Sequence, residues 1–369
     1  MPDLITNTPQ VRSPRGAVLV NDVPVEWESW SVSNNATSDA DEFSVSIPAS
    51  ALPAELPLAQ ILDGRSLRVE IRAGLFTDPT KATLSAMATL IVGRTDDVVF
   101  DPVRGSIDLA GRDFTGLLID RKTSEKFGNL TASQIATKLA ARVGLMPRVT
   151  DTKALAGRYY AIDHALSTRE VSEWDLLQWL AQQEDFLAVV RGNELYFGPK
   201  PKGGDPYVLQ WRQGQGGPSS FDGERLYLKR NLTVAKDVTV TVRSWNPKSK
   251  TVIVATYPRS KAKGAAPGTS GAAVPDGFVR NIPGLTQEQA LQRAQALHAQ
   301  LTAHEMRMEA TVPGDTVLTV QTPIALRGTG TAFDQTYYPE AIQRSMSFTD
   351  GFQMTVRAKN RAPGNEVNL

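Results

Sequence analysis

The sequence predicts a mainly β chain with an α+β insertion: two related β-barrel domains, a small α/β domain and a helix-bearing segment. Three observations predict this class. Short alternating segments fill the first third and the last third of the 369 residues. Helical periodicity is concentrated between them. A hairpin-like pattern from the first strand region returns near the end of the chain. A length of this order is typical of two to three domains.

The first β-barrel domain is expected over residues 1–117. Residues 16–25 predict a hairpin, because Asn21 and Asp22 stand between two apolar runs. Several short strands at regular spacing, without a long helical period among them, favour a barrel or a sandwich. The further strands expected are Trp27–Ser33, Glu42–Ile47, Ser66–Ala73, Ala88–Arg94, Asp97–Phe100 and Gly105–Ala110.

The inserted α/β domain is expected over residues 118–200. Thr131 and Gln134 have the spacing of a capping box, and the helix that follows should end at Gly144. A second helix should begin near Ser172. It leads into two short strands separated by a two-residue turn, which predicts a hairpin. These strands are Phe186–Arg191 and Glu194–Phe197.

The second β-barrel domain is expected over residues 201–257 together with 310–369. Between these parts, residues 258–309 form a flexible loop and a helix segment. Residues 258–275 are rich in Gly, Ala, Pro and Ser, which is typical of a linker, and Thr286–Ala303 has a helical period. The strands expected here are Arg225–Leu228, Leu232–Val234, Val238–Trp245, Thr251–Tyr257, Val317–Val320, Ile324–Leu326, Tyr337–Met346 and Gly351–Ala358.

An internal similarity links the two strand regions. Leu90–Arg94, a turn and Gly105–Asp113 resemble Glu340–Arg344, a turn and Gly351–Arg361. Each is a strand that ends in arginine, followed by a turn, a glycine and an alternating strand. Two unrelated hairpins would also give this pattern, whereas a common origin would mean two related barrels in one chain.

Signals of catalysis, of a bound cofactor or of a metal site are weak, and no residue is assigned to any of these roles. The chain has no cysteine, which excludes disulfides and thiolate chemistry. His298 and His304 do not share a helical face, and His164 has no serine in a nucleophile elbow to act on. The glycine runs lack the strand and helix that a phosphate loop requires. A carboxylate pair brought together by the fold stays open.

The polar N-terminus predicts no secretory signal, and no apolar stretch approaches the ~18 residues of a membrane span. We therefore expect synthesis in a cytoplasm and no membrane insertion.

Charge is distributed unevenly along the chain, although 40 basic and 39 acidic residues give a net charge of +1. Residues 16–64 carry eight carboxylates and no lysine or arginine, and residues 225–263 carry ten cations against Asp237. Two solvated faces explain this pattern, as do complementary subunit surfaces or a basic channel lining. The candidate interface or lumen residues are Arg225, Lys229, Arg230, Lys236 and Arg243, and the candidate complementary acids are Asp39, Asp41 and Glu42.

Several segments together carry a resemblance to a known family. They are Val23–Val32, Glu42–Ile47, Gly64–Gly74, Leu90–Val98, Ile107–Asp120 (IDLAGRDFTGLLID), Asn129–Ala136 and Ser172–Phe186 (SEWDLLQWLAQQEDF), which leads into Arg191–Gly198. With these segments the chain resembles the baseplate hub proteins of bacteriophage tails. That group includes the Mu-type hub, the late control protein D family and the base of the VgrG spike of type VI secretion.

The resemblance implies a structural protein and not an enzyme. It implies a homotrimer in which each chain gives two barrels, so that a pseudo-sixfold ring joins the tail tube to the central spike and lets DNA pass. The implied partners are tail tube or distal tail proteins, a separate spike protein, other baseplate proteins and transiting DNA bound without specificity, in the virion. No cofactor is implied. Three alternatives stay open: a tail-associated cell-wall hydrolase or peptidase, a hub-like base of a type VI secretion spike, and a soluble module that binds glycan or nucleic acid.

Overall fold

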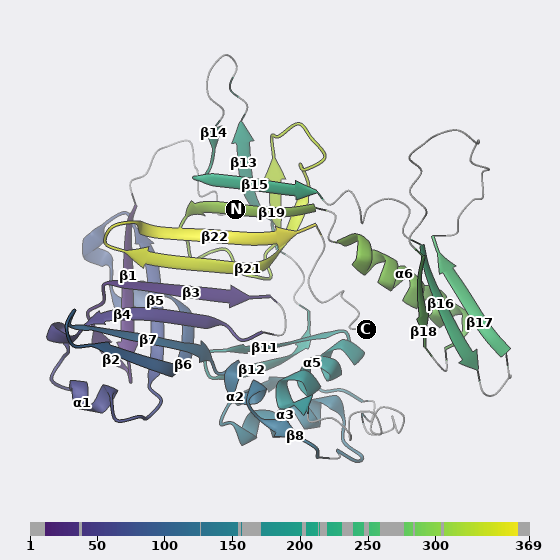
Figure 1. Ribbon diagram of the computed structural model, residues 1–369, viewed down its shortest axis with the longest axis horizontal. Coiled ribbons are helices and arrows are strands. Elements are labelled where there is room, and N and C mark those ends of the chain that lie inside the picture. The colour runs from purple at the N-terminus through teal and green to yellow at the C-terminus, as the bar shows by residue number, and fades with distance from the viewer. Residues whose placement is uncertain are drawn as a thin grey trace. The chain divides into compact units, whose positions relative to one another are not determined.

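The protein is mostly β-strand with few helices (Figure 1), which confirms the mainly β class. The computed structural model describes residues 12–36, 39–125, 127–153, 156, 171–200, 204–212, 214, 220–230, 239–246, 251–258, 277–282, 285–303 and 306–360. The chain divides into two compact units. The first consists of Met1–Tyr207, Thr311–Pro323 and Glu340–Val356, and the second of Val208–Ala310, Ile324–Pro339 and Arg357–Leu369. The four predicted domain boundaries stay a prediction.

An antiparallel sheet forms the main part of the first unit. Its strands follow the order β2-β1-β5-β6-β7-β4-β3-β21. Asn21 and Asp22 both have positive φ (50° and 66°), and Val20 lies opposite Val23, so the first predicted hairpin is confirmed. The strands are β1 (Ser13–Val20), β2 (Val23–Val25), β3 (Ser29–Asn35), β4 (Glu42–Pro48), β5 (Arg68–Phe76), β6 (Ala88–Asp101), β7 (Ser106–Asp113) and β21 (Thr336–Ser347).

Alternation along these strands builds the core. In β4, Phe43, Val45 and Ile47 are buried, while the residues between them face outward or lie at intermediate depth. The two strands expected over 88–94 and 97–100 form one strand, β6, whose register shifts between Thr95 and Asp97. Short helical turns cover the connections: η1 (Ala49–Ala51), α1 (Leu58–Ile61), η2 (Pro79–Lys81) and η3 (Leu84–Ala86).

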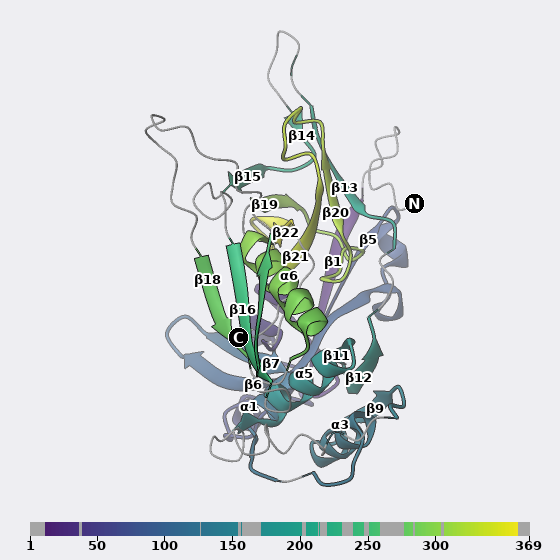
Figure 2. The ribbon, with the colours of Figure 1, turned by 90° about the vertical axis from the view of Figure 1, so that its right-hand side faces the viewer.

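The expected α/β part is present within the first unit. The capping box predicted at Thr131 and Gln134 forms, because the Thr131 side chain satisfies an N-terminal amide of its helix. Ser172 and Asp175 form a capping box that was not predicted, at the start of the predicted second helix. Helices α3 and α5 pack against the β11-β12-β9 sheet (Figure 2). The elements are α2 (Thr115–Ile119), β8 (Lys122–Thr123), α3 (Ala132–Arg142), β9 (Met146–Val149), β10 (Val171–Ser172), α5 (Glu173–Gln183), β11 (Phe186–Arg191) and β12 (Glu194–Pro199).

The second unit contains a small sheet, β17-β16-β18, that packs one face on helix α6. Val240, Val242 and Ala255 contact Ala290 and Leu297 in its core. The remaining elements are β13 (Tyr207–Arg212), β14 (Ser220–Phe221), β15 (Arg225–Arg230), β16 (Thr239–Asn246), β17 (Thr251–Tyr257), β18 (Gly277–Asn281), α6 (Gln287–Ala303), β19 (Met306–Pro313), β20 (Ile324–Arg327) and β22 (Gly351–Lys359).

Two features differ from the sequence-based expectation. Residues 317–320 were expected as a strand and are not one, whereas β13, β18 and β19 were not expected. In the part of the chain that the structure describes, the strand order is open and no barrel is closed. The predicted strand 232–234 and most of the predicted linker, 259–275, lie outside the described residues.

Candidate functional site

A buried arginine, Arg344 of β21, is the centre of a polar network in the first unit. Its side chain is 3% exposed. Arg344 Nε donates to the Asp315 carbonyl oxygen (2.8 Å), Nη1 donates to Asn34 Oδ1 (3.0 Å), and Nη2 donates to the Leu318 carbonyl oxygen. Burial lowers the pKa of Arg344, which the negative charges of Asp315 and Asp41 oppose. Since a guanidinium keeps its proton in proteins, a full positive charge is held in the core.

Asp315 organises the segment that Arg344 contacts. Its Oδ1 accepts from the amides of Val317 (2.8 Å) and Leu318 (3.0 Å), and its Oδ2 accepts from the Tyr207 hydroxyl (2.7 Å). An aspartate that bonds the amides two and three residues ahead favours a turn over an extended strand. The strand expected over Val317–Val320 was therefore wrong, because the Asp315 side chain bends the chain there.

Two carboxyl groups, Asp41 and Asp113, lie close to this network. Asp41 accepts from Asn34 Nδ2 (2.8 Å) and the Asn35 amide (2.7 Å), and burial raises its pKa against those bonds. The Asp113 amide donates to the Asp41 carbonyl oxygen, and the Asp113 carboxylate accepts two bonds from Thr115. Burial, followed by the charge of Asp41, raises the pKa of Asp113 to about 7. Asp113 therefore gains or loses its proton near neutral pH.

The three acidic candidates do not form one surface. Asp39 and Glu42 are exposed, and Glu42 lies opposite Arg112 in the β4–β7 pairing. Asp41 directs its carboxylate to asparagine donors of the same chain. Two of the three predicted acids are therefore presented to solvent, and their place in a subunit interface stays a prediction.

The basic candidates lie on two different sheets. Arg225, Lys229 and Arg230 are exposed on β15, which pairs with β19. Arg243 is exposed on β16, in the sheet that packs on α6. Lys236 lies outside the described residues. Proximity in the sequence therefore does not make these cations one cluster.

The structure adds two cations that sequence reasoning missed. Arg307 of β19 and Arg357 of β22 are exposed, and Arg357 Nε lies 3.4 Å from Glu309 Oε2. β19 pairs with both β15 and β22. The alternation of Met306 and Met308 with polar residues was the signal that would have found β19. We name the exposed side of these three strands the β15 face; it carries Arg225, Tyr227, Lys229, Arg307 and Arg357.

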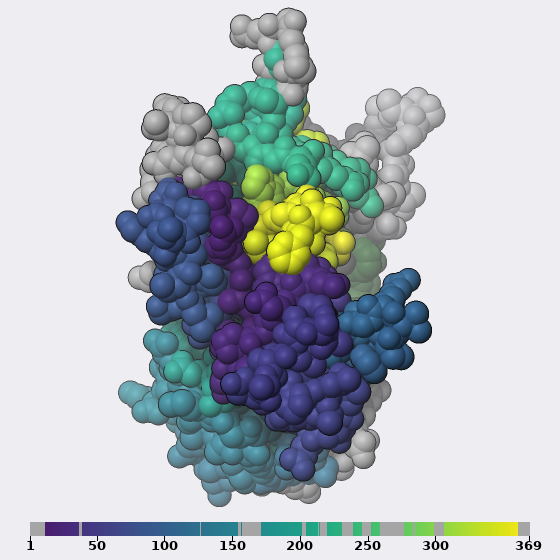
Figure 3. All heavy atoms as spheres, turned by 90° about the vertical axis from the view of Figure 1, so that its left-hand side faces the viewer, coloured from purple at the N-terminus to yellow at the C-terminus, as the bar shows by residue number. Residues whose placement is uncertain are grey.

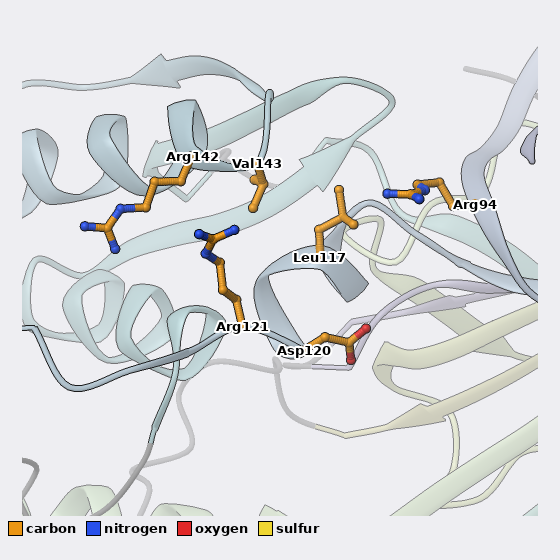
Figure 4. A pocket seen from close by; sticks show the side chains of 6 residues that line it. All are labelled: Arg94, Leu117, Asp120, Arg121, Arg142 and Val143. Carbon is orange, nitrogen blue, oxygen red and sulfur yellow. The ribbon is translucent and has the colours of Figure 1, made fainter. Parts of the chain in front are cut away.

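Three arginines line a shallow, open pocket of about 390 Å3 in the first unit. Arg94 comes from β6, Arg121 follows α2, and Arg142 ends α3. In Figure 4, Arg94 extends toward Leu117 and Arg121 extends toward Val143, whereas the Arg142 guanidinium points away from both. Asp120 and Val143 complete the lining.

Carboxylates neutralise most of the charge around this pocket. Arg112 pairs with Asp96 (2.6 Å) and Asp120 (2.9 Å), and these bonds raise the pKa of Arg112. Arg142 Nη1 donates to the buried Glu173 (2.8 Å). These pairs connect β7 with α2 and α3 with α5, so the arrangement holds the sheet and the helices of the first unit together.

The metal and histidine sites that the sequence left as weak candidates fall partly within the described residues. The described part of the chain holds no group of three or more His, Cys, Asp or Glu residues able to bind a metal. The His298 ring packs edge-on against Tyr257, with 5.2 Å between the ring centres. His164 and His304 lie outside the described residues. None of the described helices is long and apolar enough to span a membrane.

Similarity to solved structures extends along nearly the whole chain. A tail protein from Neisseria meningitidis MC58 matches with a TM-score of 0.65 and 15% identity, covering 95% of this chain and 100% of its own. The 43 kDa tail protein of prophage MuSo2 from Shewanella oneidensis matches with a TM-score of 0.64 and 15% identity, covering 96% and 99%. The chain therefore has the fold of phage tail proteins.

A more distant match is a chain of the Francisella PdpA-VgrG complex, with a TM-score of 0.53 and 9% identity, covering 95% of this chain and 59% of that one. No protein-family model matches the sequence, and no curated protein matches it either. The resemblance seen in the sequence is thus confirmed at the level of the fold.

Proposed function

We propose that this protein is a structural hub of a phage-tail baseplate, forming a trimeric, pseudo-sixfold ring that connects the tail tube to a separate spike protein and lets DNA pass. The observation that carries the proposal is the end-to-end match to two tail proteins, each covered over 99% or more of its length. A match of this extent concerns the whole architecture and not one shared module.

The two-barrel architecture is part of the proposal. The similar segments of the sequence correspond to two hairpins, β6–β7 and β21–β22, and Gly105 and Gly351 close their turns with φ of 70° and 71°. A glycine at positive φ in the same place of two hairpins supports a common origin. In the proposed trimer, strands of neighbouring copies complete the curvature that one copy leaves open.

The β15 face is proposed to line the channel. It carries four basic side chains, Arg225, Lys229, Arg307 and Arg357, and Tyr227 is 53% exposed on the same strands. Arg357 lies 3.4 Å from Glu309. Cations without base-reading geometry attract the phosphate backbone of any sequence. Reversing Lys229 to Glu should weaken retention of double-stranded DNA at low salt and leave the mass of the assembly unchanged.

Mass in solution and imaging test the hub directly. The purified chain, alone or with tail partners, should reach about three times the 40.1 kDa of one chain, and electron microscopy should show rings with threefold or pseudo-sixfold symmetry. A monomer under all these conditions would reject the proposal. Release of fragments from peptidoglycan by the purified chain would instead favour the hydrolase.

A second candidate is the base of a type VI secretion spike. The match to a chain of the PdpA-VgrG complex favours it, at a lower TM-score than the tail proteins. Co-purification distinguishes the two: assembly with phage tail components supports the baseplate hub, and assembly only with secretion-system components supports the spike base.

A further inference from the structure

One end of the sheet in the first unit gathers several turns into an exposed surface. The strand registers place Ser347, Ser29 and Ser46 side by side, and Ser46 lies opposite Asp108 of β7. Two residues further toward the same end, Ser106 lies opposite Pro48 and Asp101. The β21–β22 turn and the β6–β7 turn therefore project from the same end. Figure 3 views this end, where the yellow β21–β22 turn lies near the middle of the face and purple N-terminal segments lie to its left and below it.

Large apolar side chains are presented to solvent at this end. Phe348 is 81% exposed and Val103 is 94% exposed. The Phe348 ring stacks on Trp27 with 5.4 Å between ring centres and 12° between planes, and Trp27 packs in turn against the buried Trp30. Phe348 is therefore held in a fixed position outside the core, as an anchor residue of an interface would be.

The surroundings of Phe348 are acidic. Glu26 and Glu28 are exposed just before β3, Asp101 ends β6 and Asp350 lies in the β21–β22 turn. Two exposed cations lie at this end as well: Arg104, 3.8 Å from Asp101, and Arg15, which precedes the Gly16 that lies against Trp27. We name this surface, made of Trp27, Phe348, Val103 and these charged residues, the acidic tip.

A surface of the opposite sign lies in the second unit, on the side of β16 and β17 that faces away from α6. Trp245 lies opposite Val252, and Arg243 lies opposite Val254. Trp245, Val252 and Val254 are 51%, 62% and 48% exposed. The described residues of β16, β17 and β18 carry no carboxylate and two arginines. Arg243 shares this side of the sheet, whereas Arg280 lies opposite Val242 and therefore shares the side that packs on α6. We name this surface the tryptophan–valine face.

We propose that the acidic tip of one copy docks on the tryptophan–valine face of the next copy. Contiguous apolar side chains on a sheet face typically mark an interaction site. Contact between two acidic tips would bring carboxylates together, and contact between two tryptophan–valine faces would bring the Arg243 side chains of both copies together, so like charges disfavour contact between two identical surfaces. Docking of unlike surfaces is head-to-tail, and such contacts close into a ring when the rotation allows. The inference rests on the proposed ring and names the surfaces that build it.

Complementation between two variants tests this pairing in the full-length chain. Phe348→Ser removes one surface and Trp245→Ser removes the other, and both residues are at least half exposed. Each variant alone should be monomeric by light scattering at concentrations where the parent chain assembles. An equal mixture should give dimers and nothing larger, because each variant retains the surface that the other lacks. Met146→Ser, at a residue 59% exposed outside both surfaces, should assemble like the parent.

The outcomes separate this inference from the proposed function. If the parent chain assembles and both variants assemble equally well, the acidic tip and the tryptophan–valine face do not form the contact between copies. The proposed baseplate hub is not contradicted by that result. A mixture that stays monomeric overturns the head-to-tail pairing. A parent chain that is monomeric at every concentration overturns the ring and the pairing together.

A charge exchange provides a second measurement. Glu28→Arg or Arg243→Glu alone should raise the concentration needed for assembly about tenfold at low salt, and the double variant should restore assembly. Absence of any recovery in the double variant would contradict a contact between these two charges.

Discussion

The two similar hairpins, β6–β7 and β21–β22, have opposite environments for the same residue type. Arg94 of β6 and Arg344 of β21 occupy corresponding positions in the sequence pattern. Arg94 is exposed, lines an open pocket and donates to Ser66 Oγ (3.2 Å). Arg344 is buried and bonds two backbone carbonyl oxygens and Asn34. The segment that begins at Asp315 makes the difference, because it supplies those carbonyl groups.

A repeated sequence pattern therefore specifies the backbone conformation of a hairpin, but it does not specify whether the side chains of that hairpin are buried or exposed. An arginine tolerates burial only where several acceptors surround it, since desolvation of the charge costs several kcal/mol. Only one of the two hairpins has a neighbouring segment that provides acceptors.

The largest expected effect comes from removing the buried arginine. Arg344→Met leaves the carbonyl groups of Asp315 and Leu318 without their donor and should lower the free energy of unfolding by about 3–5 kcal/mol. Arg94→Met should change it by less than about 0.5 kcal/mol, because the residue is exposed. Urea denaturation of both variants measures the contrast, and equal losses would remove the distinction between the hairpins.

The next effect concerns Asp113, at the end of β7. Its pKa of about 7 lies above the ordinary value, so the native state binds the proton more tightly than the unfolded state. This contribution to stability is present below about pH 4 and is lost as the pH rises to about 7. In Asp113→Asn, the free energy of unfolding relative to the parent should therefore rise by up to about 4 kcal/mol from pH 4 to pH 8.

Asp108→Asn, at an exposed residue of the same strand, is the matched control and should show no such trend. Urea denaturation of the parent and of both variants at several pH values measures this pH dependence of the free energy of unfolding. A difference between Asp113→Asn and the parent that does not change with pH would mean that Asp113 is ionised throughout.

The two glycines at the turns should respond alike. Gly105 and Gly351 have nearly the same positive φ, and a Cβ at either position would meet no atom within 4 Å. Substitution by alanine should therefore cost only the backbone strain of the left-handed region, about 1–2 kcal/mol each. Thermal unfolding should show similar losses, and a difference above about 1 kcal/mol would argue against equivalent turns.

The smallest effects on stability should come from the turn tips. Val103→Ser removes a side chain that contacts almost nothing, and Phe348→Ser removes one stacking contact with Trp27. We expect losses below about 0.5 and about 1 kcal/mol, respectively. A much larger loss for Phe348→Ser would mean that the residue serves the fold of one copy and not an interface.

Much of the local structure could be predicted from residue patterns. The hairpin at Asn21 and Asp22, the capping box at Thr131 and the helix that starts near Ser172 formed as expected. The uneven charge along the sequence indicated surfaces of opposite sign, but it did not indicate which residues belong to each surface. Asp41 bonds within its own chain, whereas Arg307 and Arg357 join the β15 face only through strand pairing.

The sequence by itself determined the mainly β class, the caps and turns, and the resemblance to tail hub proteins, because these depend on contacts between residues close in the chain. Tertiary structure alone decided the burial of Arg344, the raised pKa of Asp113, the bend at Asp315 and the gathering of Trp27, Phe348 and Val103 at one end of a sheet. The physical reason is that desolvation and strand register depend on partners far apart in the sequence, which no local pattern specifies.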